Sequence, residues 1–299
     1  MEKVELIDVG PRDGLQSQSK IITTEDKIEF ISRLARAGVK RIEVASFVNP
    51  KRVPQMADVD DLIARLPRIK NARYIGLVLN EKGLDRALET DLDEINCAIV
   101  TTDTFCQRNQ GKTSKEMLVS LERMVKFASD RKRFFGVTIA ASFGCPFEGV
   151  VDPNKVLDLA KSLVACGVDE ISIADTIGVA VPTQVTELVE LLKPELGKIP
   201  LRLHFHNTRN TGISNVYAAI QAGVRIIDSS CGGLGGCPFA PGATGNVGTE
   251  DVLYLLEGMG FSTEISMPEI IGTSKWLGSV LSEELPAMVA RAGPFPKTS

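Results

Sequence analysis

His204 and His206 are the only two histidines in this chain of 299 residues, and they stand two positions apart at the end of an apolar run. Residues two apart on a β-strand point to the same face, so both imidazoles could reach one divalent cation. The alternative is a pair of hydrogen-bonded histidines at a strand end. The spacing predicts one of these two arrangements, and other residues have to decide between them.

The segment Gly10–Gly14 reads Gly-Pro-Arg-Asp-Gly and supplies a guanidinium at Arg12 and a carboxylate at Asp13. Asp13 and the two histidines make one carboxylate and two imidazoles, a common open ligand set for Mg²⁺, Mn²⁺, Zn²⁺ or Fe²⁺. The alternative for Asp13 is an Asx-turn or a helix cap after Pro11. Arg12 can hold a carboxylate, a phosphate or a developing enolate oxygen, or it can form a structural ion pair with Glu43.

A glycine-rich segment, residues 232–248, follows the last predicted strand and contains Cys237. It lacks the Gly-Lys-Ser/Thr of a P-loop, which argues against nucleotide hydrolysis. We interpret it as a mobile lid that carries Cys237 into the site. A thiol near a cation and Arg12 would have a lowered pKa and could act as acid, base or nucleophile. The alternative is an unreactive loop cysteine.

Short β-rich runs alternate with helical patterns, and these elements must position the residues above. The predicted strands are Val4–Val9, Arg41–Ser46, Tyr74–Leu79, Glu94–Val100, Gly136–Ser142, Glu170–Asp175, Leu201–His206 and Arg225–Ser230. Helices are predicted at Thr24–Ala37, Ser114–Asp130, Pro153–Cys166 and Pro182–Leu192. Thr24 and Asp152 carry the signals of helix starts. Gly38, Gly167 and Gly223 are suited to end helices in the left-handed conformation.

Eight β-then-α units with strands apolar on both faces predict an α/β protein with a parallel sheet covered by helices. The number of units and the length favour a (β/α)₈ TIM barrel over residues 1–262. A doubly wound open sheet is the alternative, but no Gly-x-Gly-x-x-Gly follows the first strand. Residues 263–299 are predicted to form a short C-terminal helical extension of the same domain, with a helix at Pro268–Leu281 and a loose tail at 291–299.

Polar residues gather where the predicted strands end. Glu43 and Ser46 belong to the second strand, Asp175 and Thr176 to the end of the sixth, and Asn207 follows His206. Active sites of TIM barrels form at the C-terminal ends of the strands. Buried charges are costly unless they are paired or bind a metal. This convergence therefore predicts a single site at that end of the barrel.

The composition excludes several classes of protein. The net charge is −4 with both signs mixed, which argues against a nucleic-acid binder. The start of the chain does not resemble a signal peptide, and no apolar stretch reaches the roughly 18 residues of a membrane helix. The six cysteines form no Cys-x-x-Cys pair. We therefore predict a cytoplasmic protein without a membrane partner. Its size is compatible with a homodimer.

At this point the motifs resemble the 3-hydroxy-3-methylglutaryl-CoA lyase family. The resemblance extends from the first strand to about Gly260 and is carried by five segments: Asp8–Gln16, Ser46–Asp58, Gly144–Gly149, Asp175–Gly178 and Gly233–Asn246. The isopropylmalate and homocitrate synthases share the Arg-Asp-Gly turn and the His-x-His strand. They lack the Gly-Gly-Cys-Pro segment that occurs here at 235–238.

The resemblance implies a divalent-metal TIM-barrel lyase that splits a 3-hydroxy-3-methylglutaryl thioester into acetoacetate and acetyl-CoA. Carried over residue by residue, it implies that Mg²⁺ or Mn²⁺ is bound by Asp13, His204, His206 and Asn246. It assigns catalysis to Arg12, Asp13, His204 and Cys237, with Arg12 on the enolate and Cys237 in proton transfer. The resemblance also places seven residues in or around the substrate pocket: Arg12, Gln16, Glu43, Ser46, Asp175, Thr176 and Asn207.

These assignments suit the chemistry of a retro-aldol cleavage. The tertiary hydroxyl must lose its proton, and a cation on that oxygen lowers its pKa. The base would be Asp13 or a neighbour at the metal. Cleavage places negative charge on the thioester oxygen, which a fixed guanidinium stabilises. A thiol on the lid can then protonate the enolate carbon while water is excluded.

The sequence also departs from the family pattern. The family phrase His-Cys-His-Asp-Thr-Tyr is here His204-Phe-His-Asn-Thr-Arg209, and Gln-Asn-Glu after the first motif is Gln16-Ser-Gln. Asn207 removes a charge beside the metal, and Arg209 adds one near the pocket mouth. A lyase for a different 3-hydroxy-3-substituted acyl-CoA and an acetyl-CoA-condensing synthase therefore stay open as alternatives. A third is a silent barrel that binds acyl-CoA or a partner, which predicts neither metal nor turnover.

Overall fold

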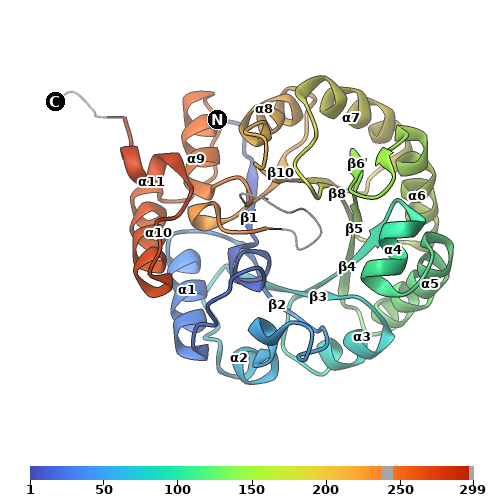
Figure 1. Ribbon diagram of the computed structural model, residues 1–299, viewed down its shortest axis with the longest axis horizontal. Helices are drawn as coiled ribbons and strands as arrows, with labels where there is room; N and C mark the ends of the chain where they lie inside the picture. The colour runs from blue at the N-terminus through green and yellow to red at the C-terminus, as the bar shows by residue number, and fades with distance from the viewer. Residues whose placement is uncertain (237–244, 296–299) are drawn as a thin grey trace.

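The computed structural model describes residues 1–236 and 245–295. At its centre is a closed barrel with the strand order β1-β10-β9-β8-β5-β4-β3-β2 (Figure 1). Its strands are β1 (Glu5–Asp8), β2 (Arg41–Ser46), β3 (Arg73–Val78), β4 (Glu94–Val100), β5 (Phe134–Ala140), β8 (Glu170–Asp175), β9 (Leu201–Phe205) and β10 (Ile226–Ser229). All neighbouring barrel strands pair in parallel. The predicted (β/α)₈ TIM barrel is confirmed.

Helices follow the strands and surround the barrel on its outer side (Figure 1). They are α1 (Thr24–Arg36), α2 (Val59–Arg65), α3 (Glu81–Leu88), α4 (Asp103–Gln110), α5 (Ser114–Asp130), α6 (Pro153–Cys166), α7 (Pro182–Leu196), α8 (Gly212–Gln221), α9 (Thr249–Gly258), α10 (Met267–Leu281) and α11 (Met288–Ala292). A small antiparallel hairpin, β6 (Gly144–Cys145) with β7 (Gly149–Val150), follows β5. Among the described helices, none has the length and apolar character of a membrane span.

The helix ends show how local sequence defines these elements. Asp152 caps α6 as predicted, because its side chain accepts a hydrogen bond from the backbone N–H of Asn154. The cap of α1 is Thr23, not Thr24, and its hydroxyl accepts from the N–H of Asp26 at 3.1 Å. Helix α7 extends beyond the predicted Leu192 to Leu196, with Pro194 inside its last turn. The three predicted helix-ending glycines, at positions 38, 167 and 223, all have positive φ.

The C-terminal extension lies along one side of the barrel (Figure 1). Helix α10 contacts α1 and α9, and α11 contacts α9 and α10. The N–H of Ala287 donates to the carbonyl of Gly232 at 3.0 Å, which ties the extension to the chain that leaves β10. The predicted loose tail is wrong at residues 291–292, which belong to α11. That 1–262 and 263–299 form a single domain remains a prediction.

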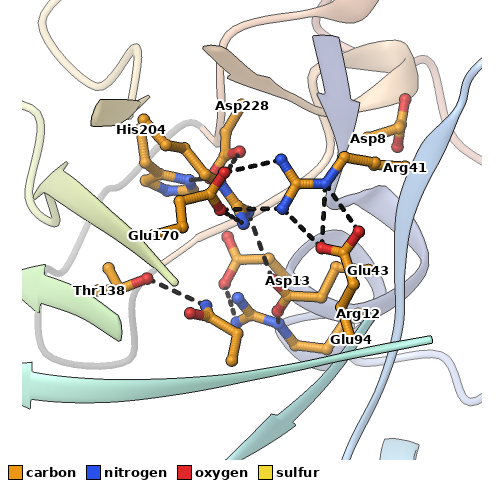
Figure 2. Close-up of polar contacts among 12 residues, drawn as sticks. Asp8, Arg12, Asp13, Arg41, Glu43, Glu94, Thr138, Glu170, His204 and Asp228 are labelled. Atoms are coloured by element: carbon orange, nitrogen blue, oxygen red, sulfur yellow. Dashed lines mark hydrogen bonds and ion pairs between the residues drawn. The ribbon is translucent and has the colours of Figure 1, made fainter. Parts of the chain in front are cut away.

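The barrel interior contains charged side chains where most barrels contain branched aliphatic residues. Figure 2 shows several of these side chains pointing toward one another from different strands. Those that are buried are Arg41, Glu43, Glu94, Glu170, Arg202, His204 and Asp228. The apolar core lies mainly between the barrel and its helices, and the polar interior leads along the barrel axis to the site described next.

Candidate metal centre and active site

Arg12 and Asp13 are presented by a tight π-helical turn, Gly10–Gly14, that begins directly after β1. The N–H groups of Arg12 and Asp13 donate to the carbonyl of Val9 at 3.1 and 2.7 Å. Asp8 fixes the start of the turn, because its Oδ1 accepts from the N–H of Gly10 at 2.9 Å. A Cβ at Gly10 would lie 2.8 Å from that oxygen, so the turn requires glycine there. The turn thus holds both side chains at the C-terminal end of the barrel.

Asp13, His204 and His206 form one cluster. Their potential ligand atoms all lie within 4.8 Å of one another. Nε2 of His206 is 3.8 Å from Oδ2 of Asp13, and the centroids of the two imidazole rings are 4.9 Å apart. The expectation that residues two apart on this strand share a face is confirmed. Asn246 joins them through a bridge to His206 and donates from Nδ2 to Oδ2 of Asp13 at 2.9 Å.

The unpaired atoms of this cluster match the donors that a cation needs. Nε2 of His206 and Oδ1 of Asn246 are both buried and have no hydrogen-bond partner among the described residues. Leaving such atoms without a partner typically costs about 1–3 kcal/mol each. An imidazole nitrogen, an amide oxygen and a carboxylate suit Mg²⁺ or Mn²⁺. The four residues predicted as ligands therefore fit a divalent cation.

Both histidine rings are oriented by their other nitrogen. Nδ1 of His204 is 3.0 Å from Oδ2 of Asp228, and Nδ1 of His206 is 3.0 Å from the carbonyl oxygen of Asp175. Since a carboxylate and a carbonyl can only accept, Nδ1 is the donor in each ring. In the neutral form of each ring, Nε2 then carries the free lone pair. Outer partners of this kind fix the tautomer and the orientation of metal-binding histidines.

The electrostatics of the cluster favour the metal-binding protonation states of Asp13 and His206. Burial raises the pKa of Asp13, but the charges of Arg12 and the two histidines outweigh it and lower that pKa to about 2. Burial lowers the pKa of His206 to about 4, so this ring is neutral near pH 7. For His204, burial is the largest single effect and lowers the pKa, but the hydrogen bond with Asp228 and the charges of Asp228 and Asp13 together outweigh it, so the net shift is upward. Asp13 and His206 are therefore in the forms that bind metals.

Arg12 is held between two carboxylates. Its Nη1 donates to Oδ1 of Asp13 at 2.5 Å, and its Nε pairs with Oε1 of Glu43. The ion pair with Glu43, an alternative raised by the sequence, is therefore present. It also fixes the guanidinium beside the cluster, with only 13% of its side chain exposed. A largely buried, immobilised guanidinium is suited to stabilise an oxyanion.

Four of the predicted pocket residues fall into two groups. Gln16 and Ser46 lie at the barrel mouth with Oε1 and Oγ buried and without a partner among the described residues. Asp175 and Thr176 instead accept hydrogen bonds from backbone N–H groups. The two carboxylate oxygens of Asp175 accept from Val179 and Ala180, and the hydroxyl of Thr176 accepts from the N–H of Ala141. The first two can meet a ligand, whereas the second two shape the loops around it.

The positions that depart from the family phrase also contact loops. Oδ1 of Asn207 accepts from the N–H of Gly212 at 3.0 Å, at the start of α8. Nη1 of Arg209 donates to the carbonyls of Ile177 and Gly178, each at 3.0 Å. Arg209 therefore connects the loop after β9 to the loop after β8. Cys237, predicted to act in proton transfer, lies outside the described residues.

Sequence reasoning missed Asp228 and Arg202, which lie directly behind the cluster. Arg202 donates to both carboxylate oxygens of Asp228, at 2.5 and 2.9 Å. A signal was available: both are charged residues in strands that are buried on both faces, and Arg202 shares the inward face with His204. Such residues need partners inside the barrel.

Comparison with known proteins gives consistent matches over the whole barrel. Residues 3–277 match the HMGL-like family model. The chain is 42% identical to the (R)-citramalyl-CoA lyase of Chloroflexus aurantiacus, covering 98% of this chain and 96% of that protein. It is 38% identical to the hydroxymethylglutaryl-CoA lyase of Bacillus subtilis, covering 96% of each.

Among solved structures, an HMG-CoA lyase of Acinetobacter baumannii in complex with coenzyme A and 3-methylmalate superimposes with a TM-score of 0.93. It is 37% identical, and the match covers 99% of this chain and 97% of the other. These named relatives are carbon–carbon lyases. They agree with the resemblance seen in the motifs.

Proposed function

The chain belongs to the HMGL-like family of carbon–carbon lyases, and from this premise we propose that it cleaves a 3-hydroxy-3-methyl acyl-CoA with the help of a divalent cation. The first candidate substrate is 3-hydroxy-3-methylglutaryl-CoA, which would give acetoacetate and acetyl-CoA. The observation that supports this most directly is that buried Nε2 of His206 and Oδ1 of Asn246, beside Asp13, have no hydrogen-bond partner among the residues that the structure describes. A silent barrel would have no reason to keep these atoms unpaired.

Asp13, His204, His206 and Asn246 would hold Mg²⁺ or Mn²⁺. When bound, such a cation supplies Lewis-acid polarisation to the 3-hydroxyl oxygen of the substrate. The chain itself contributes fixed geometry: Asp228 and the carbonyl of Asp175 orient the two rings before any ligand arrives. This arrangement reduces the reorganisation that binding would otherwise require.

Arg12 would stabilise the oxyanion that forms on the thioester during cleavage. Cleavage moves an electron pair from the breaking carbon–carbon bond onto the thioester, whose oxygen becomes negatively charged. Glu43 and Asp13 hold the guanidinium in place, so its remaining N–H groups are already oriented when that charge develops. The resulting enolate carbon then takes a proton, and we assign this step to Cys237 on the strength of the family motif.

The second candidate substrate is citramalyl-CoA, which would give pyruvate and acetyl-CoA. It is favoured by the 42% identity to an (R)-citramalyl-CoA lyase. The two thioesters share the tertiary hydroxyl, the methyl group and a distal carboxylate, and they differ by one methylene group. Discrimination by one methylene is typically worth only about 1–3 kcal/mol, so one site can accept both.

The test is acetyl-CoA release from each thioester with Mn²⁺, with Mg²⁺ and with EDTA. We expect metal-dependent release from at least one substrate, and the ratio of the two kcat/KM values identifies the preferred acyl group. Arg12→Gln serves as a matched variant that should still bind Mn²⁺ but lose turnover. Release that persists in EDTA, or no release from either thioester by protein that binds Mn²⁺, would contradict the proposal.

A further inference from the structure

Arg202 lies in β9 two residues before His204 and is 1% exposed. Its Nε and Nη2 donate to the two oxygens of Asp228 at 2.5 and 2.9 Å. Its Nη2 is also 3.5 Å from Oε2 of Glu43, and its Nη1 is 3.5 Å from Oε1 of Glu170. One guanidinium therefore contacts three buried carboxylates on three other strands.

The contact with Asp228 reaches the metal cluster. Oδ2 of Asp228 accepts from Nη2 of Arg202 and also lies 3.0 Å from Nδ1 of His204. Because the fork of Arg202 binds both carboxylate oxygens, it fixes the plane of the carboxylate. That plane in turn sets the direction in which the His204 ring, and hence its Nε2, points.

The contact with Glu43 reaches the other half of the site. Glu43 uses Oε1 to hold Nε of Arg12, and its Oε2 faces Arg202. Figure 2 shows Glu43, Glu170 and Asp228 directed into the same part of the barrel interior. Arg202 therefore stands between the carboxylate that orients His204 and the carboxylate that orients Arg12.

We propose that Arg202 is a positioning residue that fixes the metal ligand His204 and the cation Arg12 relative to each other. This inference rests on the proposed function, since it assumes that the cluster binds a cation. A lysine at this position would keep the positive charge but lose the planar fork that binds both oxygens of Asp228. Loss of the fork, and not of the charge, is therefore the informative change.

Arg41 provides a matched control. It is also buried, at 2% exposure, and it also donates to two buried carboxylates, those of Glu94 and Glu170. Its third partner is Glu5. These partners lie at the N-terminal ends of their strands, away from His204 and Arg12. A purely structural role of buried arginines would make the two positions respond alike.

The experiment compares Arg202→Lys with Arg41→Lys. Mn²⁺ binding is measured by the EPR signal of the free ion, after thermal unfolding has shown that each variant is folded. Changes in groups that orient metal ligands typically cost about 10–100-fold in affinity, so we expect Arg202→Lys to weaken Mn²⁺ binding about 10-fold. Arg41→Lys should leave the dissociation constant within about twofold. Equal effects at both positions would overturn the proposal.

Two further measurements test the two contacts separately. Asp228→Asn should weaken Mn²⁺ binding, and adding Arg202→Lys to it should have little additional effect, because coupled residues are not additive. At saturating Mn²⁺, Arg202→Lys should still lower kcat more than it changes KM, because Arg12 is displaced. If the effects of Asp228→Asn and Arg202→Lys on Mn²⁺ affinity are fully additive, the contact with Asp228 does not position His204. If kcat recovers completely at saturating Mn²⁺, the contact with Glu43 does not position Arg12.

Failure of this inference can be distinguished from failure of the proposed function. If wild-type protein and His206→Ala bind Mn²⁺ equally, the metal cluster itself is wrong. If His206→Ala abolishes binding but Arg202→Lys and Arg41→Lys behave alike, only the role of Arg202 is wrong. Should Arg202→Lys fail to fold, Arg202→Gln and Arg41→Gln replace the pair, and the same comparison decides.

Discussion

The two ends of the barrel interior contain similar charged residues but satisfy them differently. At the N-terminal end, Arg41 donates to both oxygens of Glu94 and to both oxygens of Glu170. At the C-terminal end, His206 and Asn246 each keep a buried atom without a partner among the described residues. The N-terminal end is thus a closed ion-pair network, whereas the C-terminal end has unused ligand atoms.

The comparison teaches that burial of charge does not by itself identify a site. Buried ion pairs with complete hydrogen bonding are a structural solution, although they contribute little net stability. Buried polar atoms without partners are costly and persist where a ligand completes them. Ser172 Oγ and Glu43 Oε2 in the barrel strands are also buried without a hydrogen-bond partner among the described residues, so an unpaired atom alone does not identify the site either. What marks the candidate active site is that unpaired atoms of His206 and Asn246 lie beside Asp13, within one set of potential metal ligands.

The largest effect is expected from His206→Ala, at the C-terminal end of the barrel interior. Lewis-acid polarisation supplies several kcal/mol to such a reaction, so losing a ligand should lower kcat by about 1000-fold. Mn²⁺ binding should be lost as well. In the absence of metal the free energy of unfolding should fall, because the buried ring and its hydrogen bond to the Asp175 carbonyl are lost, and removal of the unpaired Nε2 should offset part of this cost. If His206→Ala keeps full turnover but has a strongly lowered free energy of unfolding, the functional assignment of the two ends is reversed.

At the closed end, Arg41→Met should affect stability more than chemistry. It leaves Glu94 and Glu170 with fewer partners, and breaking a buried ion pair costs about 3–5 kcal/mol. We expect the lower end of that range in urea unfolding, because Arg73 and Arg202 still contact these carboxylates. Arg73→Met is the control: its side chain is 49% exposed, and its loss should cost less than about 1 kcal/mol. Equal costs would contradict a closed buried network.

The barrel and much of the candidate site could be predicted from the sequence. The ion-pair network at the N-terminal end of the barrel interior could not. The barrel follows from apolar runs and helix caps, which are local signals. The cluster of Asp13, His204 and His206 follows from rare residue types at the ends of strands. In contrast, Arg41 meets Glu170 across 129 positions and Glu94 across 53. No local pattern indicates which buried acceptor will face which donor.

The sequence also could not separate ligand contacts from loop contacts at the barrel mouth. Asp175, Thr176 and Asn207 were expected in or around the pocket because polar residues at strand ends serve binding sites. The same side chains are equally good acceptors for backbone N–H groups. In the structure all three accept such bonds, from Val179, Ala141 and Gly212, respectively. Only the arrangement of the loops reveals this use.

The smallest expected effect concerns an exposed ion pair outside the closed end. Glu264 pairs with Lys3 and Lys40, whose hydrogen bonds and charges lower its pKa from 4.5 to about 2. A carboxylate with a lowered folded-state pKa adds stability that is fully present above the unfolded pKa and is lost as the pH falls toward about 2. Glu264→Gln should therefore lower the urea midpoint slightly at pH 7, and the difference from wild type should shrink between pH 4.5 and 3. Glu190→Gln, at an exposed position of α7 without an ion pair among the described residues, should show no such trend. A difference that grows toward acid pH would show that these lysines do not stabilise the ionised carboxylate.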